Sequence, residues 1–243
     1  MNKYNGIIIS LIAGLSTLLG YFSVYIKGNK EKIIGNSLSF SAGVMIMLSI
    51  IDLLPSSIDN FSYNYNLTIS IIYSFIFFIL GYIISKIFNT RIKTKNELYN
   101  VGLSTMLGII IHNLPEGIVT YILSTINLKL GILFSIAIIL HNIPEGIGIS
   151  IPIYYSTKSK KKAFLYTFIS GISEPLGAIL SMIILYKYVN NFILGILLSI
   201  ISGLMIYISF NELIKISKKY IKNCKYIYFG MIFILIVELL LKN

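Results

Sequence analysis

Two copies of one hexapeptide contain both histidines of the chain. The first is His-Asn-Leu-Pro-Glu-Gly at 112–117, and the second is His-Asn-Ile-Pro-Glu-Gly at 141–146. In a helix the His and the Glu of each copy are four residues apart, and the Asn stands three before the Glu, so imidazole, amide and carboxylate share one face. Imidazole nitrogens and carboxylate oxygens are common ligands of divalent metals. Each hexapeptide therefore predicts half of a metal site.

Three carboxyl groups stand near the centres of apolar segments: Glu116, Glu145 and Glu174, the last within Ser-Glu-Pro-Leu-Gly at 173–177. An ionised side chain at the middle of a membrane helix costs at least ~2.5 to 3.5 kcal/mol on insertion scales. No Lys or Arg lies in the middle of these segments to neutralise them. The compensating charge must come from protons or from a bound cation, and the two nearby imidazoles favour a divalent metal. The alternative is protonated carboxyls that are hydrogen-bonded between helices.

Prolines within the hexapeptides support the same interpretation. Pro115 and Pro144 each remove a helical hydrogen bond, which predicts kinked helices with free carbonyl oxygens at Ile111 and Leu140. Polar breaks near the midplane are where many transporters bind their substrates. A purely structural alternative is that Pro and Gly only permit close helix packing, but it leaves the neighbouring His, Asn and Glu unexplained.

The composition requires a membrane around these segments. Hydrophobic residues make up 56% of the 243 residues and charged residues only 12%, with a mean hydropathy of +0.84. These values exclude a soluble globular domain and predict an all-α polytopic membrane protein with a single domain over 1–243. We expect eight transmembrane helices. They are predicted at 6–26, 33–54, 67–86, 100–124, 130–154, 163–186, 191–214 and 226–241.

Basic residues mark the orientation of these spans. The net charge is +11, yet sixteen of the twenty Lys and Arg residues fall in the loops after odd-numbered spans, so we expect no nucleic-acid partner. The other four are Lys3, Lys129, Lys187 and Lys242. By the positive-inside rule the odd-numbered loops are cytoplasmic and both termini lie outside the cytoplasm. The fourth and fifth spans then run in opposite directions, so the repeated hexapeptide is what an inverted-topology pair would give.

The two hexapeptides, together with Ser-Glu-Pro-Leu-Gly in the sixth span, resemble the motifs of the ZIP (Zrt-, Irt-like protein) metal transporters, close to the bacterial zinc-uptake and GufA-like branch. The resemblance covers essentially the whole chain. It implies an inverted-repeat 3+2+3 bundle, in many members a homodimer, that moves divalent metal into the cytosol by alternating access. It also implies a binuclear midplane site. One metal would be held by His112, Glu116, His141 and Glu145, with both glutamates bridging to a second metal held also by Asn113, Asn142 and Glu174.

Two departures from the family pattern concern the cytoplasmic side. The loop from Asn89 to Tyr99 contains no His, so we expect no histidine-rich metal sensor there. The seventh span ends Asn211-Glu212-Leu213-Ile214-Lys215, where relatives often have an acidic residue before the Glu and a Pro after the Leu-Ile. This departure predicts an exit route that is less acidic than in relatives.

Two further acids are candidates for the metal pathway. Asp52 near the outer end of the second span and Glu212 near the inner end of the seventh could bind metal on its way in and out. The alternatives are a cap or turn role beside Pro55 for Asp52, and an interfacial pair with Lys215 for Glu212.

The types of ligand limit which metal ions the protein could transport. Imidazole, amide and carboxylate without thiolate suit Zn(II), Fe(II), Mn(II), Co(II) or Cd(II), argue against Cu(I) and make Mg or Ca a poor match. Zinc is the leading expectation, as transported substrate and not as a prosthetic group. The bias toward Ile, Asn, Lys and Tyr is typical of an AT-rich genome and indicates a bacterial cell membrane.

Two other classes of function remain open at this point. An intramembrane metal-dependent enzyme would use the polar cluster to activate water, but the chain has no His-Glu-x-x-His motif and no evident nucleophile with a paired base. A proton-coupled solute carrier fits the carboxyls, but it does not account for the doubled His-Asn-x-Pro-Glu.

Overall fold

The computed structural model describes residues 4–91, 94–183 and 190–242, and within these ranges the regular structure is entirely helical. Lys3, Lys93 and Lys187, which contribute to the predicted charge asymmetry, lie outside the described residues. The first half of the chain forms α1 (Asn5–Leu15), α2 (Thr17–Tyr21), the 3-10 helix η1 (Phe22–Tyr25), α3 (Lys30–Leu48), the π-helix η2 (Ser49–Leu53), α4 (Leu54–Ser62) and α5 (Leu67–Arg91). The second half forms α6 (Glu97–Ile126), α7 (Leu128–Thr157), α8 (Lys160–Ile183), α9 (Asn191–Ile208), the π-helix η4 (Ser209–Ile214), α10 (Lys215–Tyr220) and α11 (Tyr226–Lys242).

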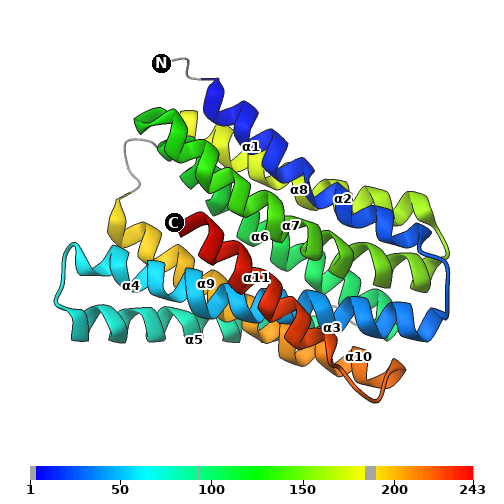
Figure 1. Cartoon of the computed structure of the whole chain (residues 1–243). Coiled ribbons are helices and arrows are strands. Elements are labelled where there is room, and N and C mark those ends of the chain that lie inside the picture. Colours follow the sequence, from blue (N-terminus) through cyan, green and yellow to red (C-terminus); the bar gives the residue numbers. More distant parts are fainter. Residues whose placement is uncertain (1–3, 92–93, 184–189, 243) are drawn as a thin grey trace.

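Several of these helices join into longer segments that form a single elongated bundle (Figure 1). Among the described residues, seven segments are long and apolar enough to cross a membrane. They are Asn5–Tyr25, Lys30–Ser62, Leu67–Ile87, Glu97–Ile126, Leu128–Thr157, Lys160–Ile183 and Asn191–Tyr220. The predicted eighth span forms α11, whose apolar part, Tyr226–Leu240, is shorter than the other seven. The chain is therefore an all-helical, multi-pass membrane protein.

Segments two and seven share a local irregularity. In each, an α-helix passes into a short π-helix and back to α, first at η2 and then at η4. The hydroxyl of Ser49 donates to the carbonyl oxygen of Met45 at 2.8 Å, and that of Ser209 donates to Met205 at the same distance. π-Helical turns are rare and occur frequently at functional sites. Each of these two carries one acid, Asp52 in η2 and Glu212 in η4.

Close backbone contacts hold α11 against α3 and α5 against α9. A Cβ at Gly43 of α3 would collide with the carbonyl oxygen of Ile227 in α11, and a Cβ at Gly203 of α9 would collide with that of Phe78 in α5. Small residues at such crossings let membrane helices approach each other closely. As a result, α11 packs on α3 much as α5 packs on α9. The helix α11 is therefore part of the bundle (Figure 1).

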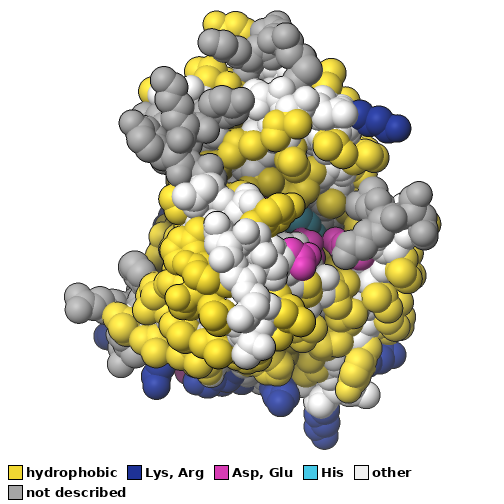
Figure 2. Space-filling view, turned by 90° about the vertical axis from the view of Figure 1, so that its left-hand side faces the viewer, with side chains coloured by type: hydrophobic (Ala, Val, Ile, Leu, Met, Phe, Trp, Pro, Cys, Tyr) yellow, Lys and Arg dark blue, Asp and Glu magenta, His cyan; other side chains and the backbone are white. Residues whose placement is uncertain are grey.

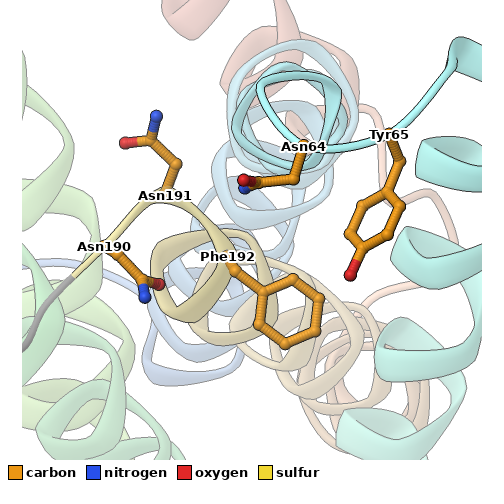
Figure 3. Close-up of a pocket in the computed structure, with 5 residues that line it drawn as sticks. All are labelled: Asn64, Tyr65, Asn190, Asn191 and Phe192. Atoms are coloured by element: carbon orange, nitrogen blue, oxygen red, sulfur yellow. The ribbon is translucent and has the colours of Figure 1, made fainter.

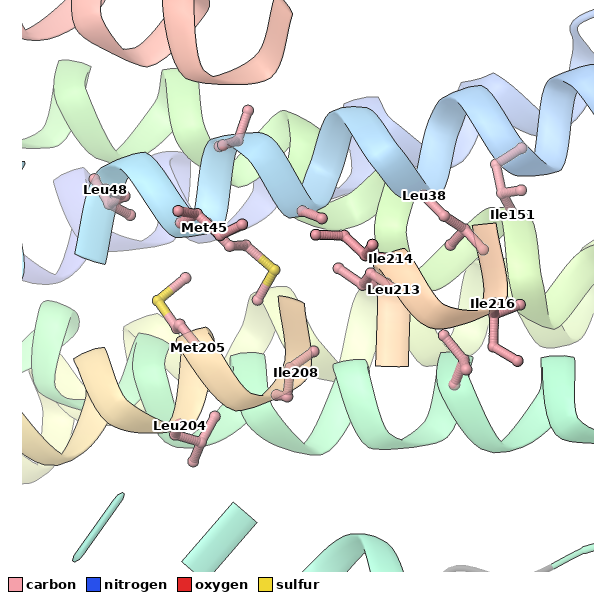
Figure 4. Packing of buried hydrophobic residues seen from close by; sticks show 14 of the residues in the cluster. Leu38, Met45, Leu48, Ile151, Leu204, Met205, Ile208, Leu213, Ile214 and Ile216 are labelled. Atoms are coloured by element: carbon pink, nitrogen blue, oxygen red, sulfur yellow. The ribbon is translucent and has the colours of Figure 1, made fainter. Parts of the chain in front are cut away.

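The largest apolar core lies between α3 and the α9–η4–α10 segment (Figure 4). Leu38, Met45 and Leu48 of α3 are buried against Met205 and Ile208 of α9. Lipid tails are as apolar as leucine, so this packing stabilises the bundle by close van der Waals contact and not by removal of surface from water. Segments two and seven are thereby held in direct contact with each other.

A second apolar cluster, which we call the α6–α8 cluster, lies at the end of the bundle where α7 ends and α8 begins. Its members come from four helical elements, and each is at most 7% exposed. They are Val24, Met106, Ile109, Ile149, Ile153 and Ala163. Apolar side chains therefore fill the contact of α6 and α7 with η1 and α8 at this end of the bundle.

Candidate metal centre

The two hexapeptides lie at the middles of α6 and α7, which pass each other within the bundle. Both helices continue through Pro115 and Pro144, so the prolines do not end them. The carbonyl oxygen of Pro144 accepts a hydrogen bond of 2.6 Å from Ser41 of α3, which ties α7 to the neighbouring segment. A continuous helix keeps the side chains four residues apart on one face, as the sequence pattern requires.

One carboxylate oxygen lies between the two histidines. Oε1 of Glu116 is 3.0 Å from Nε2 of His141 and 3.1 Å from Nε2 of His112. One ligand atom from each of these residues lies within 4.8 Å of the other two, and all three side chains are buried. The pairing crosses from α6 to α7, because Glu116 belongs to one hexapeptide and His141 to the other. Two nitrogens and an oxygen thus face a common point.

Glu145 extends this cluster from the α7 side. Its Oε1 lies 3.6 Å from Nε2 of His112, and its side chain is fully buried. Neither carboxylate oxygen of Glu145 has a hydrogen-bond partner among the described residues. A buried acceptor without a donor is costly, so each such group calls for a bound partner. A cation is the partner that carboxylate and imidazole lone pairs would both satisfy.

The two asparagines use their amide N–H groups to hold neighbouring helices. Nδ2 of Asn113 donates to the carbonyl oxygen of Ser170 in α8 at 3.2 Å, and Nδ2 of Asn142 donates to that of Ala13 in α1 at 3.1 Å. The Oδ1 atoms of both asparagines are buried without a partner among the described residues. Each amide therefore donates a hydrogen bond to a neighbouring helix, while its carbonyl oxygen is available to accept a bond or to bind a cation.

Glu174 of α8 joins the centre through Asn142. Nδ2 of Asn142 also donates to Oε2 of Glu174 at 3.2 Å, while Oε1 of the same carboxylate has no partner among the described residues. Close approach of α8 to α6 requires Gly117, where a Cβ would collide with the carbonyl oxygen of Glu174. The last residue of the hexapeptide thus allows a third helix to bring its carboxylate to the site.

Asp52 reaches the same centre from η2. It lines a cavity of about 180 Å³ together with His112, Glu116 and His141. Figure 2 looks onto the end of the bundle where α4 ends and α9 begins, and it shows histidine and acidic side chains within a hollow. The alternative role considered for Asp52 was a cap or turn beside Pro55, but the helix continues from η2 into α4 at this point.

Ser56 and Asn60, which the sequence analysis missed, line this cavity beside Asp52. The hydroxyl of Ser56 donates to Oδ1 of Asp52 at 3.3 Å, and Nδ2 of Asn60 donates to the carbonyl oxygen of Ser56 at 2.8 Å. The available signal was their spacing of four and eight residues from Asp52, which places all three on one helix face.

Glu212 lies apart from this cavity. Its carboxylate is buried in η4 and accepts a hydrogen bond from Nδ2 of Asn89 in α5, which also donates to the hydroxyl of Tyr207 at 3.2 Å. Asn89 belongs to the helix and not to the predicted loop. The structure therefore separates the two candidate pathway acids, with Asp52 in the central cavity and Glu212 in a contact between α5 and η4.

Comparison with known proteins gives a consistent match. The sequence model of the ZIP zinc transporter family matches residues 89–238, a range that contains both hexapeptides and Glu174. The zinc transporter ZupT of Streptococcus mutans serotype c is 38% identical, with 93% of this chain and 92% of the relative aligned. ZupT of Clostridium perfringens is 35% identical over 90% of this chain and 88% of its own. ZupT of Campylobacter jejuni subsp. jejuni is 34% identical over 88% of each chain.

Proposed function

The chain belongs to the ZIP zinc transporter family, and on that basis we propose that zinc crosses the membrane by way of His112, Glu116 and His141. The chain is a transporter and not an enzyme. The observation that carries the proposed route is the convergence of two imidazole nitrogens on one carboxylate oxygen at 3.0 and 3.1 Å in a buried site. Zinc takes nitrogen and oxygen ligands of this kind, and transport requires that some of its coordination remain open to exchange.

A second metal position completes the proposal. The residues for it are Asn113, Asn142, Glu145 and Glu174, with Glu116 and Glu145 bridging the two ions. Support comes from their buried oxygen atoms, since Oδ1 of each Asn, both oxygens of Glu145 and Oε1 of Glu174 have no hydrogen-bond donor among the described residues. Oxygen-rich sites bind divalent ions more weakly than closed thiolate sites do, which suits an ion that must leave.

The ligand types set the range of cargo. Nitrogen and oxygen donors without thiolate accept Zn(II), Fe(II), Mn(II), Co(II) and Cd(II), and they disfavour Cu(I). We propose zinc as the principal substrate because the relatives described above are named as zinc transporters. The transported ion is the substrate, and the proposal includes no prosthetic group.

Matched contacts support an inverted repeat of three helices, two helices and three helices. Asn142 donates to Ala13 as Asn113 donates to Ser170. A Cβ at Gly146 would collide with the carbonyl oxygen of Thr17, as one at Gly117 would with that of Glu174. Ala13 and Thr17 precede Ser170 and Glu174 by the same sequence separation. In this proposal α11 is the eighth span, and it corresponds to α5.

This symmetry also supports alternating access. The cavity at His112 extends past Val119 and Phe134, toward the end where α4 ends and α9 begins. On its other side, the apolar core between α3 and the α9–η4–α10 segment also includes Val101 of α6 and Ile151 of α7. By the positive-inside rule the cavity end faces outward, so the conformation accepts metal from outside. An exchange of conformations between the two repeats would close this cavity and open the cytoplasmic side, where Glu212 would leave Asn89 and receive the ion.

Localisation and assembly follow from the same proposal. We place the chain in a bacterial cell membrane with both termini outside the cytoplasm. A homodimer, which the family resemblance implies, would contain two separate pathways, because every proposed ligand comes from one chain.

Uptake of radioactive zinc into proteoliposomes tests the proposal. The variant is Glu116→Gln combined with Glu145→Gln, which keeps side-chain size but removes both carboxylates. The matched control is Glu31→Gln, which alters an exposed glutamate at the start of α3. We expect saturable uptake by the wild type and the control, and loss of uptake in the double variant. Unchanged uptake in the double variant would contradict the route, and no zinc uptake by folded wild type would contradict zinc transport itself.

A further inference from the structure

A ladder of oxygen-bearing side chains runs along one face of the second segment. Asp52, Ser56, Asn60 and Asn64 follow each other at intervals of four residues. The first three line the cavity that contains His112, and Asn64 lines a separate pocket at the end of α4. Four-residue spacing stacks Asp52, Ser56 and Asn60 along the helix, and Asn64 follows in the turn after α4, so the ladder leads from the outer pocket toward the midplane.

Hydrogen bonding leaves the ladder rich in acceptors. Ser56 donates its hydroxyl proton to Asp52 at 3.3 Å, and Asn60 donates its amide N–H to the backbone oxygen of Ser56 at 2.8 Å. The hydroxyl proton of Ser56 and one of the two amide N–H groups of Asn60 are thereby engaged within the ladder itself. The oxygen lone pairs of the Asn60 amide and the Ser56 hydroxyl remain, and they are groups that coordinate a cation and not an anion.

Among the described residues, the lining of the outer pocket contains no charged side chain. It measures about 660 Å³ and is bounded by Asn64 and Tyr65 on one side and by Asn190, Asn191 and Phe192 at the start of α9 on the other (Figure 3). Asn190 uses its side-chain oxygen to cap the N–H of Ile193 at 3.0 Å. Among the described residues that line this pocket and the cavity, the first carboxylate that an entering cation meets is that of Asp52.

We propose that Asp52, Ser56 and Asn60 form an all-oxygen station that holds the incoming divalent cation, still partly hydrated, before it reaches His112 and His141. This inference rests on the proposed function. A cavity of about 180 Å³ holds an ion with several waters, since one water occupies about 30 Å³ of liquid. One carboxylate with two neutral oxygens binds a divalent ion weakly, so the station concentrates the ion without trapping it. The ion then exchanges water for imidazole at the deeper site.

The station has a kinetic signature that separates it from the midplane ligands. We expect Ser56→Ala and Asn60→Leu each to raise KM for zinc by about 5- to 10-fold with little change in maximal rate, because they remove binding that precedes translocation. Asn60→Asp adds a carboxylate and should lower KM, an effect that structural damage would not produce. The matched control is Ser62→Ala, which removes an exposed hydroxyl that bonds to the backbone of the same helix.

The experiment is radioactive zinc uptake by proteoliposomes over a range of zinc concentrations, with protein folding checked by size-exclusion chromatography. A rise in KM for Ser56→Ala and Asn60→Leu, with a fall for Asn60→Asp, supports the station. If all three match Ser62→Ala while Glu116→Gln with Glu145→Gln abolishes uptake, the station is wrong and the midplane route stands. If folded wild type takes up no zinc, the transport proposal fails and the station fails with it.

Discussion

Nε2 of His141 in α7 lies 3.0 Å from Oε1 of Glu116 in α6, so the imidazole of one hexapeptide is directed at the carboxylate of the other. His112 of the first hexapeptide faces the same oxygen at 3.1 Å. Neither hexapeptide forms the cluster alone, since its ligands are divided between two helices. In the proposed site, the position of α6 relative to α7 therefore determines whether the two imidazoles and the carboxylate can bind one ion.

Removal of the shared carboxylate should abolish stabilisation by zinc. A ligand at about 100 times its dissociation constant stabilises a single-site protein by about 2.7 kcal/mol. We expect zinc to raise the melting temperature of the detergent-solubilised wild type and of Glu31→Gln, but not that of Glu116→Gln. Differential scanning fluorimetry with a thiol-independent dye measures this. An equal zinc-induced shift in Glu116→Gln would show that the metal binds elsewhere.

A methyl group at Gly117 should separate α8 from α6. The added Cβ of Gly117→Ala would meet the backbone oxygen of Glu174, which cannot rotate away as a side chain would. Overpacking of this kind costs about 1 to 3 kcal/mol, and here it also displaces a proposed ligand. We expect lower thermal stability and strongly reduced zinc uptake.

Gly148→Ala is the matched control for this prediction. Its Cβ would face the side chains of Ser41 and Thr105 at 3.3 and 3.6 Å, and no backbone atom is among its closest contacts. We expect nearly normal uptake and stability in this variant. Equal damage in the two variants would indicate that the bundle tolerates no added methyl group and would remove the special role of Gly117.

Cysteine labelling should reveal which end of the pathway is open. The chain has one cysteine, Cys224, so a Cys224→Ser background is free of thiols. Val119→Cys lies in the cavity and Ile109→Cys in the α6–α8 cluster. We expect a membrane-impermeant maleimide added outside intact cells to label Val119→Cys, and zinc to protect it. Ile109→Cys should remain unlabelled from outside.

Ser62→Cys, at an exposed position near the end of α4, serves as the positive control for labelling from outside. The contradicting outcome is labelling of Ile109→Cys from outside and no labelling of Val119→Cys, even in the absence of zinc. It would mean that the cavity opens toward the cytoplasm.

The position of α11 can be tested by reporter fusions. If α11 crosses the membrane, alkaline phosphatase fused after Asn243 is outside the cytoplasm and active, whereas fusion at Asn223, before α11, is inactive. A fusion at Asn127, between α6 and α7, provides an external reference. Equal activity at residues 223 and 243 would mean that α11 does not cross and that the chain has seven spans.

The sequence predicted the helices and the grouping of the central side chains better than the contacts around them. His112 and Glu116 are four residues apart, so helical geometry alone places them together, and the second hexapeptide repeats that geometry at His141. The structure brings these side chains into one cluster as the pattern indicates. Contacts within a helix follow from spacing and require no knowledge of how distant segments pack.

Contacts between distant segments were harder to foresee. The hydrogen bond between Asn89 and Glu212 joins α5 to η4, and nothing in the spacing of either segment indicates it. Ser56 and Asn60 carry no charge and looked like ordinary polar residues near a helix end. Their spacing from Asp52 indicates a shared helix face, but only the cavity shows that they share its wall with Asp52.

One further signal was present in the sequence and was missed. Gly43, Met45, Ile46, Ser49, Asp52 and Leu53 have equivalents at the same spacing, namely Gly203, Met205, Ile206, Ser209, Glu212 and Leu213. The π-helices η2 and η4 coincide with this match. The repeat is spread over an apolar background of Ile and Leu, which obscures it when only charged and polar motifs are compared.

The most direct test of the central claim is zinc K-edge X-ray absorption on the zinc-loaded protein, purified without a histidine tag. The chain has two histidines, so imidazole scattering can come only from His112 and His141. We predict nitrogen and oxygen neighbours at about 2.0 to 2.1 Å with the outer-shell scattering of two imidazoles. That scattering should be absent in His112→Gln with His141→Gln. A zinc spectrum of the wild type without imidazole scattering would contradict the proposed site.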